Sequence, residues 1–422
     1  MSSSRNYFLS ISIIGVLFFI FGYVTWLNGT LIPFLKLACE LTSDGQALLV
    51  TFAFYIAYFF LAIPSSFILN RTGYKKGMSL GLWVMATGAF LFIPAAQSRS
   101  FELFLTGLFI QAAGMALLQT ACNPYISVIG PIESASKRIS IMGICNKAAG
   151  VLSPIVLSAI VLKGASGIED QLRVTTDAAS RHELLQELSE RVINPYLMMA
   201  VVLVLFGVII WLSPLPEIES PPAEETTDGA TEKKNIFQFP HLLLGVLCIF
   251  LYVGAEVMAG DVIGTYGKAQ GMSLDETKNF TSYTLISMVI GYIIGVSTIP
   301  RFLKQETALK LSALVGIALS TLAFATSGYI SILFIALLGL ANSLMWPAIF
   351  PMAIKGLGKF TKIGSALLIM GIAGGAILPQ VYGLVVKWMP AQTAFMVCTV
   401  PCYLYILYFA VKGHLAGKPA VA

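Results

Sequence analysis

The sequence carries very little charge. Only 11% of its 422 residues are Asp, Glu, Lys or Arg, whereas 57% are hydrophobic. A soluble globular protein has roughly 25% charged residues, and a shortfall of this size cannot be hidden inside a soluble core. We therefore expect most of the surface to face lipid. The net charge of +5 is then more typical of basic loops on one side of a membrane than of a nucleic-acid-binding surface.

Residue patterns typical of metal sites and disulfide frameworks are also missing. The chain has three His and six Cys, and no Cys-x-x-Cys pair occurs. No His-Glu-x-x-His motif and no cluster of metal ligands is found along the sequence, so metal-assisted hydrolysis is not indicated. We expect a protein that is not an enzyme and that has no cofactor and no metal.

Long apolar runs are the main structural signal. A bilayer core of about 30 Å requires about 20 apolar residues in a helix, and backbone groups in lipid must be hydrogen-bonded internally. The sequence therefore predicts an all-α membrane protein. The run from Tyr7 to Leu27 is too long for the core of a signal peptide and is interpreted as the first span. The twelve predicted spans are 8–35, 47–69, 77–96, 101–127, 140–162, 195–213, 240–264, 280–299, 308–326, 329–351, 363–386 and 393–411.

Basic residues are distributed unevenly between alternate loops. By the positive-inside rule, the loops richer in Lys and Arg lie in the cytoplasm. This places both termini inside and predicts a multi-pass protein of the cell inner membrane. The basic residues of the predicted cytoplasmic loops are Arg71, Lys75, Lys76, Lys137, Arg138, Arg301, Lys304, Lys310, Lys355, Lys359 and Lys362. The opposite short loops carry only Lys36, Arg99, Lys268, Lys278 and Lys387.

Two connections are longer than the rest. Residues 163–194 are predicted to lie outside, with a short amphipathic helix around His182–Val192. Residues 214–239 are predicted to lie inside; they are rich in Pro and acidic residues, lack apolar periodicity and are typical of a flexible linker. This linker separates six spans from six, which predicts an N-terminal half (1–213) and a C-terminal half (240–422).

The two halves resemble each other at an offset of about 225 residues. In span five "IMGICNKAAGVLSPIV" is similar to "LIMGIAGGAILPQVY" in span eleven, and Arg71 after span two is matched by Arg301 after span eight. Such a parallel duplication of six-helix halves is the architecture of major facilitator transporters, whose substrate site lies between the halves near the midplane. We assign Arg71 and Arg301 to a cytoplasmic gate.

Several stretches resemble one family within that superfamily. They are "WLNGTLIPFL" in span one, "AFYIAYFFLAIPSSFIL" and "NRTGYKKG" around span two, "GMALLQTACNPYISVIGP" in span four, "RISIMGICNKAAG" in span five and "FLYVGAEVMAGD" in span seven. Together they are similar to the fucose–galactose–glucose proton symporter family, over nearly the whole chain. The resemblance implies a major facilitator fold and uptake of a sugar by alternating access. We expect the protein to be a monomer surrounded by lipid.

The sequence departs from that family at two positions that would carry protons. In the family's fucose symporter an Asp in span one and a Glu in span four take part in proton coupling, and the matching positions here are Gly29 and Gln119. Neither side chain can titrate. The span-five Asn of that symporter is matched by Asn146, which is followed by Lys147. Because some family members are described as sodium-dependent, we favour Na⁺ over H⁺ as the coupling ion.

A sugar site requires paired hydrogen-bond donors and acceptors, such as amides, beside an aromatic face. Span four carries Gln111, Gln119 and Asn123 at multiples of four residues, which places them along one helix face. Lipid tolerates amides poorly, so this face is predicted to point inward. Asn28 in span one and Asn146 in span five are assigned to the same group. The alternative is that these amides only hydrogen-bond neighbouring helices.

The second half offers four further candidates for sugar contacts. They are Tyr283 in span eight, Asn342 and Trp346 in span ten, and Gln380 in span eleven. Asn342 and Trp346 share a helix face, and Trp346 is expected to stack on the apolar face of a sugar. The alternative is that Trp346 anchors its span at the membrane interface.

Three ionisable residues lie well inside spans, where charge is costly and usually functional. They are Lys147 in span five, and Glu256 and Asp261 in span seven. Lys147 lies about 12 Å from the cytoplasmic end of its span, and Glu256 about 24 Å from that of its own. A direct pair then requires long reach or helix tilt, and a neutral Lys147 or pairing in one conformation are open alternatives. For Asp261, nearer the outer end, the alternative is simple solvation.

These features predict a secondary active importer of a monosaccharide such as glucose or galactose, coupled to a cation. The central site is expected between the halves. Glu256 is the preferred residue for the coupling ion because it lies deeper than Asp261. The alternatives are an uncoupled facilitator for fructose, fucose or N-acetylglucosamine, and a sugar sensor that does not transport.

Overall fold

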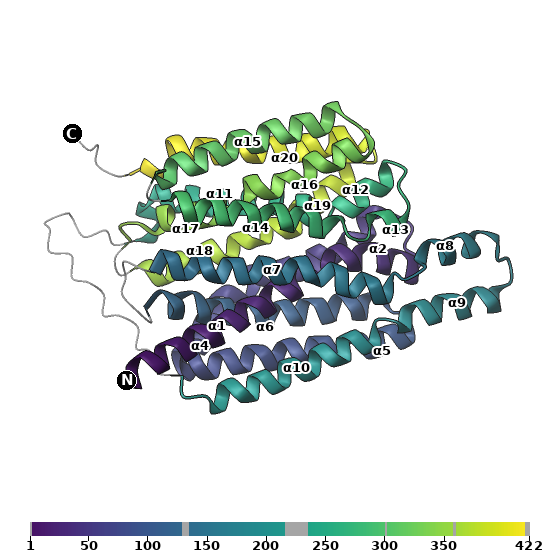
Figure 1. Ribbon diagram of the computed structural model, residues 1–422, viewed down its shortest axis with the longest axis horizontal. Helices are drawn as coiled ribbons and strands as arrows, with labels where there is room; N and C mark the ends of the chain where they lie inside the picture. The colour runs from purple at the N-terminus through teal and green to yellow at the C-terminus, as the bar shows by residue number, and fades with distance from the viewer. Residues whose placement is uncertain (1, 129–134, 216–234, 300–301, 358–359, 418–422) are drawn as a thin grey trace, which may run out of the picture.

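The computed structural model describes residues 2–128, 135–215, 235–299, 302–357 and 360–417. Within these ranges all regular elements are helices, and twelve passages are long and apolar enough to cross a membrane. They fall on the twelve predicted spans, which confirms the all-α membrane fold. Figure 1 shows the helices lying side by side, with their axes roughly parallel and both termini at the same end of the bundle.

The N-terminal half contributes spans one to six. Its helices are α1 (Ser2–Thr25), α2 (Asn28–Ala38), α3 (Asp44–Ala47), α4 (Leu49–Phe90), α5 (Phe92–Ser98), α6 (Phe101–Val128), α7 (Ala135–Val161), α8 (Ala165–Val174), α9 (Ala178–Glu190) and α10 (Ile193–Leu212). Most of the predicted linker, residues 216–234, lies outside the described residues.

The C-terminal half contributes spans seven to twelve and follows a short 3₁₀ turn, η2 (Ile236–Gln238). Its elements are α11 (Pro240–Gly260), α12 (Ile263–Ala269), α13 (Leu274–Thr277), α14 (Phe280–Thr298), α15 (Gln305–Ala325), α16 (Gly328–Asn342), α17 (Met345–Ile354), α18 (Thr361–Met370), η4 (Gly371–Ala373), α19 (Gly374–Val385), α20 (Ala391–Val411) and η5 (Gly413–Leu415).

The two ends of the bundle differ. We call the end with both termini the terminal end, and the opposite end, where α8 and α9 project beyond the other helices, the hairpin end (Figure 1). The helix predicted around His182–Val192 is present as α9, although it begins at Ala178. The distribution of basic residues in the sequence predicts that the terminal end faces the cytoplasm.

Some spans are broken inside the bundle. Helix α1 gives way to α2 at Trp26 and Leu27, and α11 gives way to α12 at Asp261 and Val262. These breaks occupy corresponding places, in the first span of each half. Paired interruptions of this kind mark the binding region in many transporters, because they leave backbone and side-chain groups free for a ligand. The length of an apolar run cannot reveal them, since most residues at the breaks are apolar themselves.

One close helix contact is repeated in both halves. A Cβ atom on Gly22 of α1 would lie 1.7 Å from the carbonyl oxygen of Asn146 in α7, and one on Gly374 of α19 would lie 1.7 Å from that of Phe250 in α11. Gly22 and Phe250 are 228 residues apart, as are Asn146 and Gly374. The same contact therefore occurs twice, with the glycine on opposite partners, and it supports the internal duplication.

The Gly22 contact leads to a prediction about stability. Gly22→Ala should lower the free energy of unfolding by about 1–3 kcal/mol, because the new methyl group must push α1 and α7 apart. Thermal unfolding in detergent micelles measures this change. Gly167→Ala in α8 is the matched control, since its Cβ would have nothing within 4 Å. Equal melting temperatures for the two variants would contradict the tight contact.

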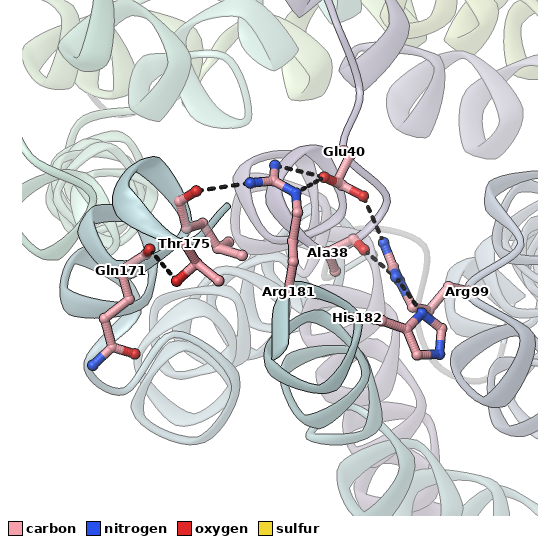
Figure 2. A network of polar contacts seen from close by, with 8 residues as sticks. Ala38, Glu40, Arg99, Gln171, Thr175, Arg181 and His182 are labelled. Carbon is pink, nitrogen blue, oxygen red and sulfur yellow. Dashed lines mark hydrogen bonds and ion pairs between the residues drawn. The ribbon is translucent and has the colours of Figure 1, made fainter. Parts of the chain in front are cut away.

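Figure 2 shows a polar network at the hairpin end that joins three parts of the N-terminal half. The Glu40 carboxylate, just after α2, accepts hydrogen bonds from Arg181 at 2.6 Å and Arg99 at 3.1 Å. Arg99 also donates to the Ala38 carbonyl at 3.1 Å and faces His182 at 3.4 Å. Partial burial opposes the charge of Glu40, but the two guanidinium groups outweigh it and lower the pKa of this carboxyl.

The lowered pKa of Glu40 predicts a pH-dependent contribution to stability. The contribution is complete above the unfolded-state pKa of about 4.3 and is lost as pH falls through the lower folded-state value. Glu40→Gln should therefore destabilise the protein at neutral pH, by less than about 1 kcal/mol because the pairs are partly exposed. Thermal unfolding at neutral and acidic pH checks this. The difference from wild type should shrink in acid, and Glu183→Gln on the exposed face of α9 should show neither effect.

Candidate functional site

A buried ion pair joins the two halves. The Nζ atom of Lys147 in α7 lies 2.9 Å from Oε1 of Glu256 in α11, and each side chain is 10% exposed. A charge removed from water needs a partner of opposite sign, and each of these residues supplies it for the other. The pair therefore places two of the three predicted intramembrane charges at one point between the halves.

Counting from the predicted span ends separates these two side chains by more than this distance. Span five begins at Ile141, close to the predicted residue 140, so the earlier start of α7 at Ala135 does not place Lys147 deeper in the membrane. The long side chain of Lys147 covers the distance to Glu256. Of the alternatives that the sequence leaves open, direct pairing is the one that this conformation adopts.

An aromatic side chain that the sequence reasoning missed covers the ion pair. Trp26, at the break between α1 and α2, is 2% exposed. The Nζ atom of Lys147 lies 4.5 Å from the centre of its ring, a distance typical of a cation–π contact. Cβ atoms on Gly150 and Gly260 would approach the ring to 2.5 and 2.3 Å. Trp26 is thus wedged between α7 and α11, and its position two residues before Asn28 is the signal that could have indicated it.

Aromatic side chains also line the C-terminal half next to Glu256. Tyr252, one turn earlier in α11, lies beside the Glu256 carboxylate. The rings of Tyr252 and Trp346 are 6.5 Å apart, and Trp346 stacks on Phe350 at 5.6 Å. Trp346 is half-buried. The ring of Tyr252 therefore lies between the ion pair and Trp346, the aromatic residue predicted in span ten.

The three amides of span four do not share one direction. Gln119 donates to the Tyr58 hydroxyl at 3.0 Å, and Gln119 and Asn123 are both half-buried. Gln111 is 1% exposed and packs against Gly88, where a Cβ would lie 2.7 Å from its Cγ. Each step of four residues turns the face by about 40°, so two steps separate Gln111 from Gln119 by about 80°. In this conformation Gln111 therefore lies apart from Gln119 and Asn123, and its contact with a sugar stays a prediction.

Asp261, at the break between α11 and α12, is fully enclosed. Its carboxyl is 1% exposed, and Oδ2 accepts a hydrogen bond from the Tyr55 hydroxyl at 3.4 Å. The Asn28 amide and the Gly29 N–H lie beside the same carboxyl. Neither Oδ1 of Asp261 nor the Asn28 side chain has a hydrogen-bond partner among the described residues. The alternative that Asp261 is simply solvated is therefore wrong, because α2 and α4 cover it.

Residues 14–379 match the family model described as Major Facilitator Superfamily. The chain belongs to this superfamily. A glucose/galactose transporter of Brucella abortus biovar 1 (strain 9-941) is 33% identical over 417 residues, covering 98% of this chain and 96% of the relative. An L-fucose-proton symporter of Escherichia coli (strain K12) is 30% identical over 390 residues, covering 90% and 88%.

Solved structures agree with this assignment. The crystal structure of the major facilitator transporter FucP in the outward conformation matches with a TM-score of 0.76 at 29% identity, covering 96% of this chain and 99% of that chain. A bacterial homologue of the human lysosomal transporter Spinster, with a TM-score of 0.59 at 15% identity, shares the fold alone. Membership of the superfamily makes this protein a multi-pass transporter and not an enzyme, as predicted.

Hydrogen bonds and ion pairs join the two halves of this major facilitator from the level of the Lys147–Glu256 pair to the hairpin end. Lys268 pairs with Glu169 at 3.1 Å, which is the contact nearest to solvent. The hydrogen bonds and ion pairs between the halves, within the described ranges, are Lys147–Glu256, Tyr55–Asp261, Ser282–Val151, Ser158–Asn279, Asp275–Ser166 and Lys268–Glu169. None of these contacts lies on the terminal side of Lys147. The conformation is therefore closed at the hairpin end.

Two predicted amides act between helices of a single half. Asn146 donates to the Phe18 carbonyl in α1 at 3.3 Å. Asn342 is fully buried and accepts a hydrogen bond from the Tyr403 hydroxyl in α20 at 2.9 Å. The alternative interpretation, that amides hydrogen-bond neighbouring helices, describes both residues in this conformation.

Two other candidates lie away from the ion pair. Tyr283 is 50% exposed and shares an outward face of α14 with Ile286 and Ile290, which are 43% and 48% exposed. Gln380 lines a shallow surface pocket at the hairpin end with Gln46 of α3. Helical spacing alone did not show which face of α14 or α19 is turned inward, and the assignment of these two side chains to the sugar site stays a prediction.

The predicted gate is described only in part. Arg71 is exposed at the terminal end, in the reversal of α4 where Gly73 has a φ of +75°. Arg301 lies outside the described residues. The role of both residues stays a prediction.

Proposed function

We propose that this protein imports a hexose of the glucose or galactose type across the cell inner membrane, together with a monovalent cation. The observation that carries the proposal is the buried Lys147–Glu256 pair, which lies between the halves and beside the ring of Trp26. The glucose/galactose transporter of Brucella abortus, similar over nearly its whole length, supports this class of substrate.

Side chains from both halves suit the chemistry of a sugar. A hexose presents hydroxyl groups at its rim, which need both donors and acceptors, and apolar C–H faces, which pack on aromatic rings. Gln119 and Asn123 supply amides from the N-terminal half. Trp346 supplies a half-buried ring from the C-terminal half. A sugar between them would contact both halves at once, so its binding would depend on how the halves are arranged.

The hydrogen bonds and ion pairs between the halves at the hairpin end suit a mechanism of alternating access. With the terminal end in the cytoplasm, as loop charge predicts, the described conformation is closed to the outside. Opening to the outside would break the Lys268–Glu169 pair and the other contacts that join the two halves at the hairpin end. One chain supplies both halves and therefore the whole site between them. We propose that the monomer is the working unit.

Different observations favour sodium and a proton as the coupling ion. Sodium is favoured by the loss of titratable groups at Gly29 and Gln119. A proton is favoured by the L-fucose-proton symporters among the relatives and by Asp261, a buried carboxyl that no ion pair among the described residues neutralises. We propose the proton, and retain sodium as the other arm of the test.

Uptake by purified protein in liposomes tests the proposal. Labelled D-glucose should enter, and unlabelled D-galactose should compete better than fucose, fructose or N-acetylglucosamine. An inward pH gradient without sodium should concentrate the sugar, whereas an uncoupled facilitator would only equilibrate it. Sugar binding detected by tryptophan fluorescence without any uptake would identify a sensor and overturn the proposal.

A further inference from the structure

We propose that the carboxyl group of Asp261 is where the coupling proton binds, and that it must be protonated before the halves can close at the hairpin end. The inference rests on the transport function proposed above. It departs from the expectation that Glu256 carries the ion, because Glu256 is already neutralised by Lys147 at 2.9 Å.

Asp261 has no such partner. Among the described residues no Lys, Arg or His side chain lies within ion-pair distance of it. Its hydrogen bond from the Tyr55 hydroxyl is long at 3.4 Å, and Oδ1 has no hydrogen-bond partner within the described part of the chain. An ionised carboxylate held in this way is costly in a dry interior, whereas a neutral acid costs far less. The enclosed site therefore suits the protonated form.

The enclosure is made by the opposite half. Asp261 belongs to the C-terminal half, but Tyr55 comes from α4 and Asn28 and Gly29 from α2 of the N-terminal half. Trp26 packs against Gly260, the residue before Asp261. When the halves part at the hairpin end, these covering groups are withdrawn and Asp261 meets water from that side. Closure thus carries Asp261 from water into a dry site, which links closure to uptake of a proton.

The titratable and charged groups that face Asp261 do not change this conclusion. From α4 it faces the hydroxyl of Tyr55, itself 3% exposed, and from its own helix Glu256, whose charge is balanced by Lys147. From α2 it faces only the Asn28 amide and a backbone N–H. Thr281 of α14 is the nearest hydroxyl to Gly29, and it donates to the Gly260 carbonyl at 2.8 Å.

The same neighbours argue for a proton over sodium. Sodium requires several oxygen acceptors around it, as hard cations generally do. The Tyr55 hydroxyl and the Gly29 N–H approach the Asp261 carboxyl as donors. These two donors leave a metal ion few free oxygen ligands beside the carboxyl, which disfavours sodium at this site.

Asp261→Asn is the central variant, because Asn imitates the protonated acid. In liposomes without sodium, one pH unit drives at most about tenfold accumulation for one proton per sugar. Wild type should approach this value with labelled D-glucose, and Asp261→Asn should fall to a ratio of one. Exchange of labelled for unlabelled sugar at equal pH should stay within about twofold of wild type. Asp170→Asn, on the exposed surface of α8, is the matched control and should behave as wild type.

A second measurement needs no sugar. The fluorescence of Trp26 should change with pH in the purified protein, because its ring packs against the residue next to Asp261, and the change should vanish in Asp261→Asn but persist in Asp170→Asn. Undiminished pH-driven accumulation by Asp261→Asn, or accumulation by wild type driven only by sodium, would overturn the inference. If wild type exchanges no sugar while the titration still depends on Asp261, the proposed function fails and the proton site stands.

Discussion

Glu256→Gln should reduce uptake at least about 100-fold, because it leaves the charge of Lys147 buried without a counter-ion. Removing one member of a buried ion pair costs about 3–5 kcal/mol, and about 1.4 kcal/mol corresponds to a factor of ten. The Lys147 side chain is 10% exposed and rests on the ring of Trp26. It cannot reach water without moving the break between α1 and α2. We therefore expect Lys147→Gln to be as damaging as Glu256→Gln.

Two double variants keep this prediction testable if the single ones do not fold. Lys147→Gln with Glu256→Gln removes both charges and should recover the melting temperature. Lys147→Glu with Glu256→Lys restores a pair of reversed polarity and should recover part of the uptake. Lys268→Gln is the control, since the Lys268–Glu169 pair is 33% and 25% exposed and should matter little. Full concentrative transport by Glu256→Gln alone would remove Glu256 from the mechanism.

Gln119→Ala and Asn123→Ala should each weaken sugar binding roughly tenfold. The loss of one hydrogen bond that leaves a buried partner unsatisfied costs about 1–3 kcal/mol. For Gln119 the partner within the protein is the Tyr58 hydroxyl, which is 1% exposed. Gln119→Glu is the complementary variant, because it restores a titratable carboxyl at a position where the resembling fucose symporter has one. It should add a pH dependence that wild type lacks at this site.

The affinity is measured by quenching of tryptophan fluorescence with D-glucose and D-galactose. Gln111→Ala is the matched control, because Gln111 lies in the same helix but packs against Gly88. It removes the same amide and should leave the affinity unchanged. Unaltered affinity in folded Gln119→Ala and Asn123→Ala proteins would move the sugar site away from span four.

The candidate site was only partly accessible to sequence reasoning. Gln111, Gln119 and Asn123 were proposed together because three amides in one membrane helix must avoid lipid, but the structure packs Gln111 against Gly88. The reason is geometric: a face defined at four-residue steps turns by about 40° per step. The outward position of Tyr283 in this conformation was hidden for a related reason, since α14 has polar and aromatic residues on both its inner and outer faces.

The pairing of Lys147 with Glu256 illustrates a second limit. Both residues stood out because charges are rare in spans, but their distance depends on how the two halves pack against each other. The burial of Asp261 likewise depends on how the two halves pack against each other. Nothing near it in the chain covers it; Tyr55 and Asn28 do so from another half.

The sequence by itself determined that this protein is a bundle of twelve membrane helices, and its internal repeat predicts two related halves. The number of helices depends on the length of apolar runs, which is local along the chain, and the repeat can be read by comparing the sequence with itself. Only the tertiary structure decided that Trp26 covers an ion pair between the halves and that Asp261 is sealed without a counter-charge. These facts require helices more than 100 residues apart in the chain to meet, as Lys147 and Glu256 do across 109 positions. Side-chain pairing across such distances depends on helix rotation and depth, which helical periodicity leaves free.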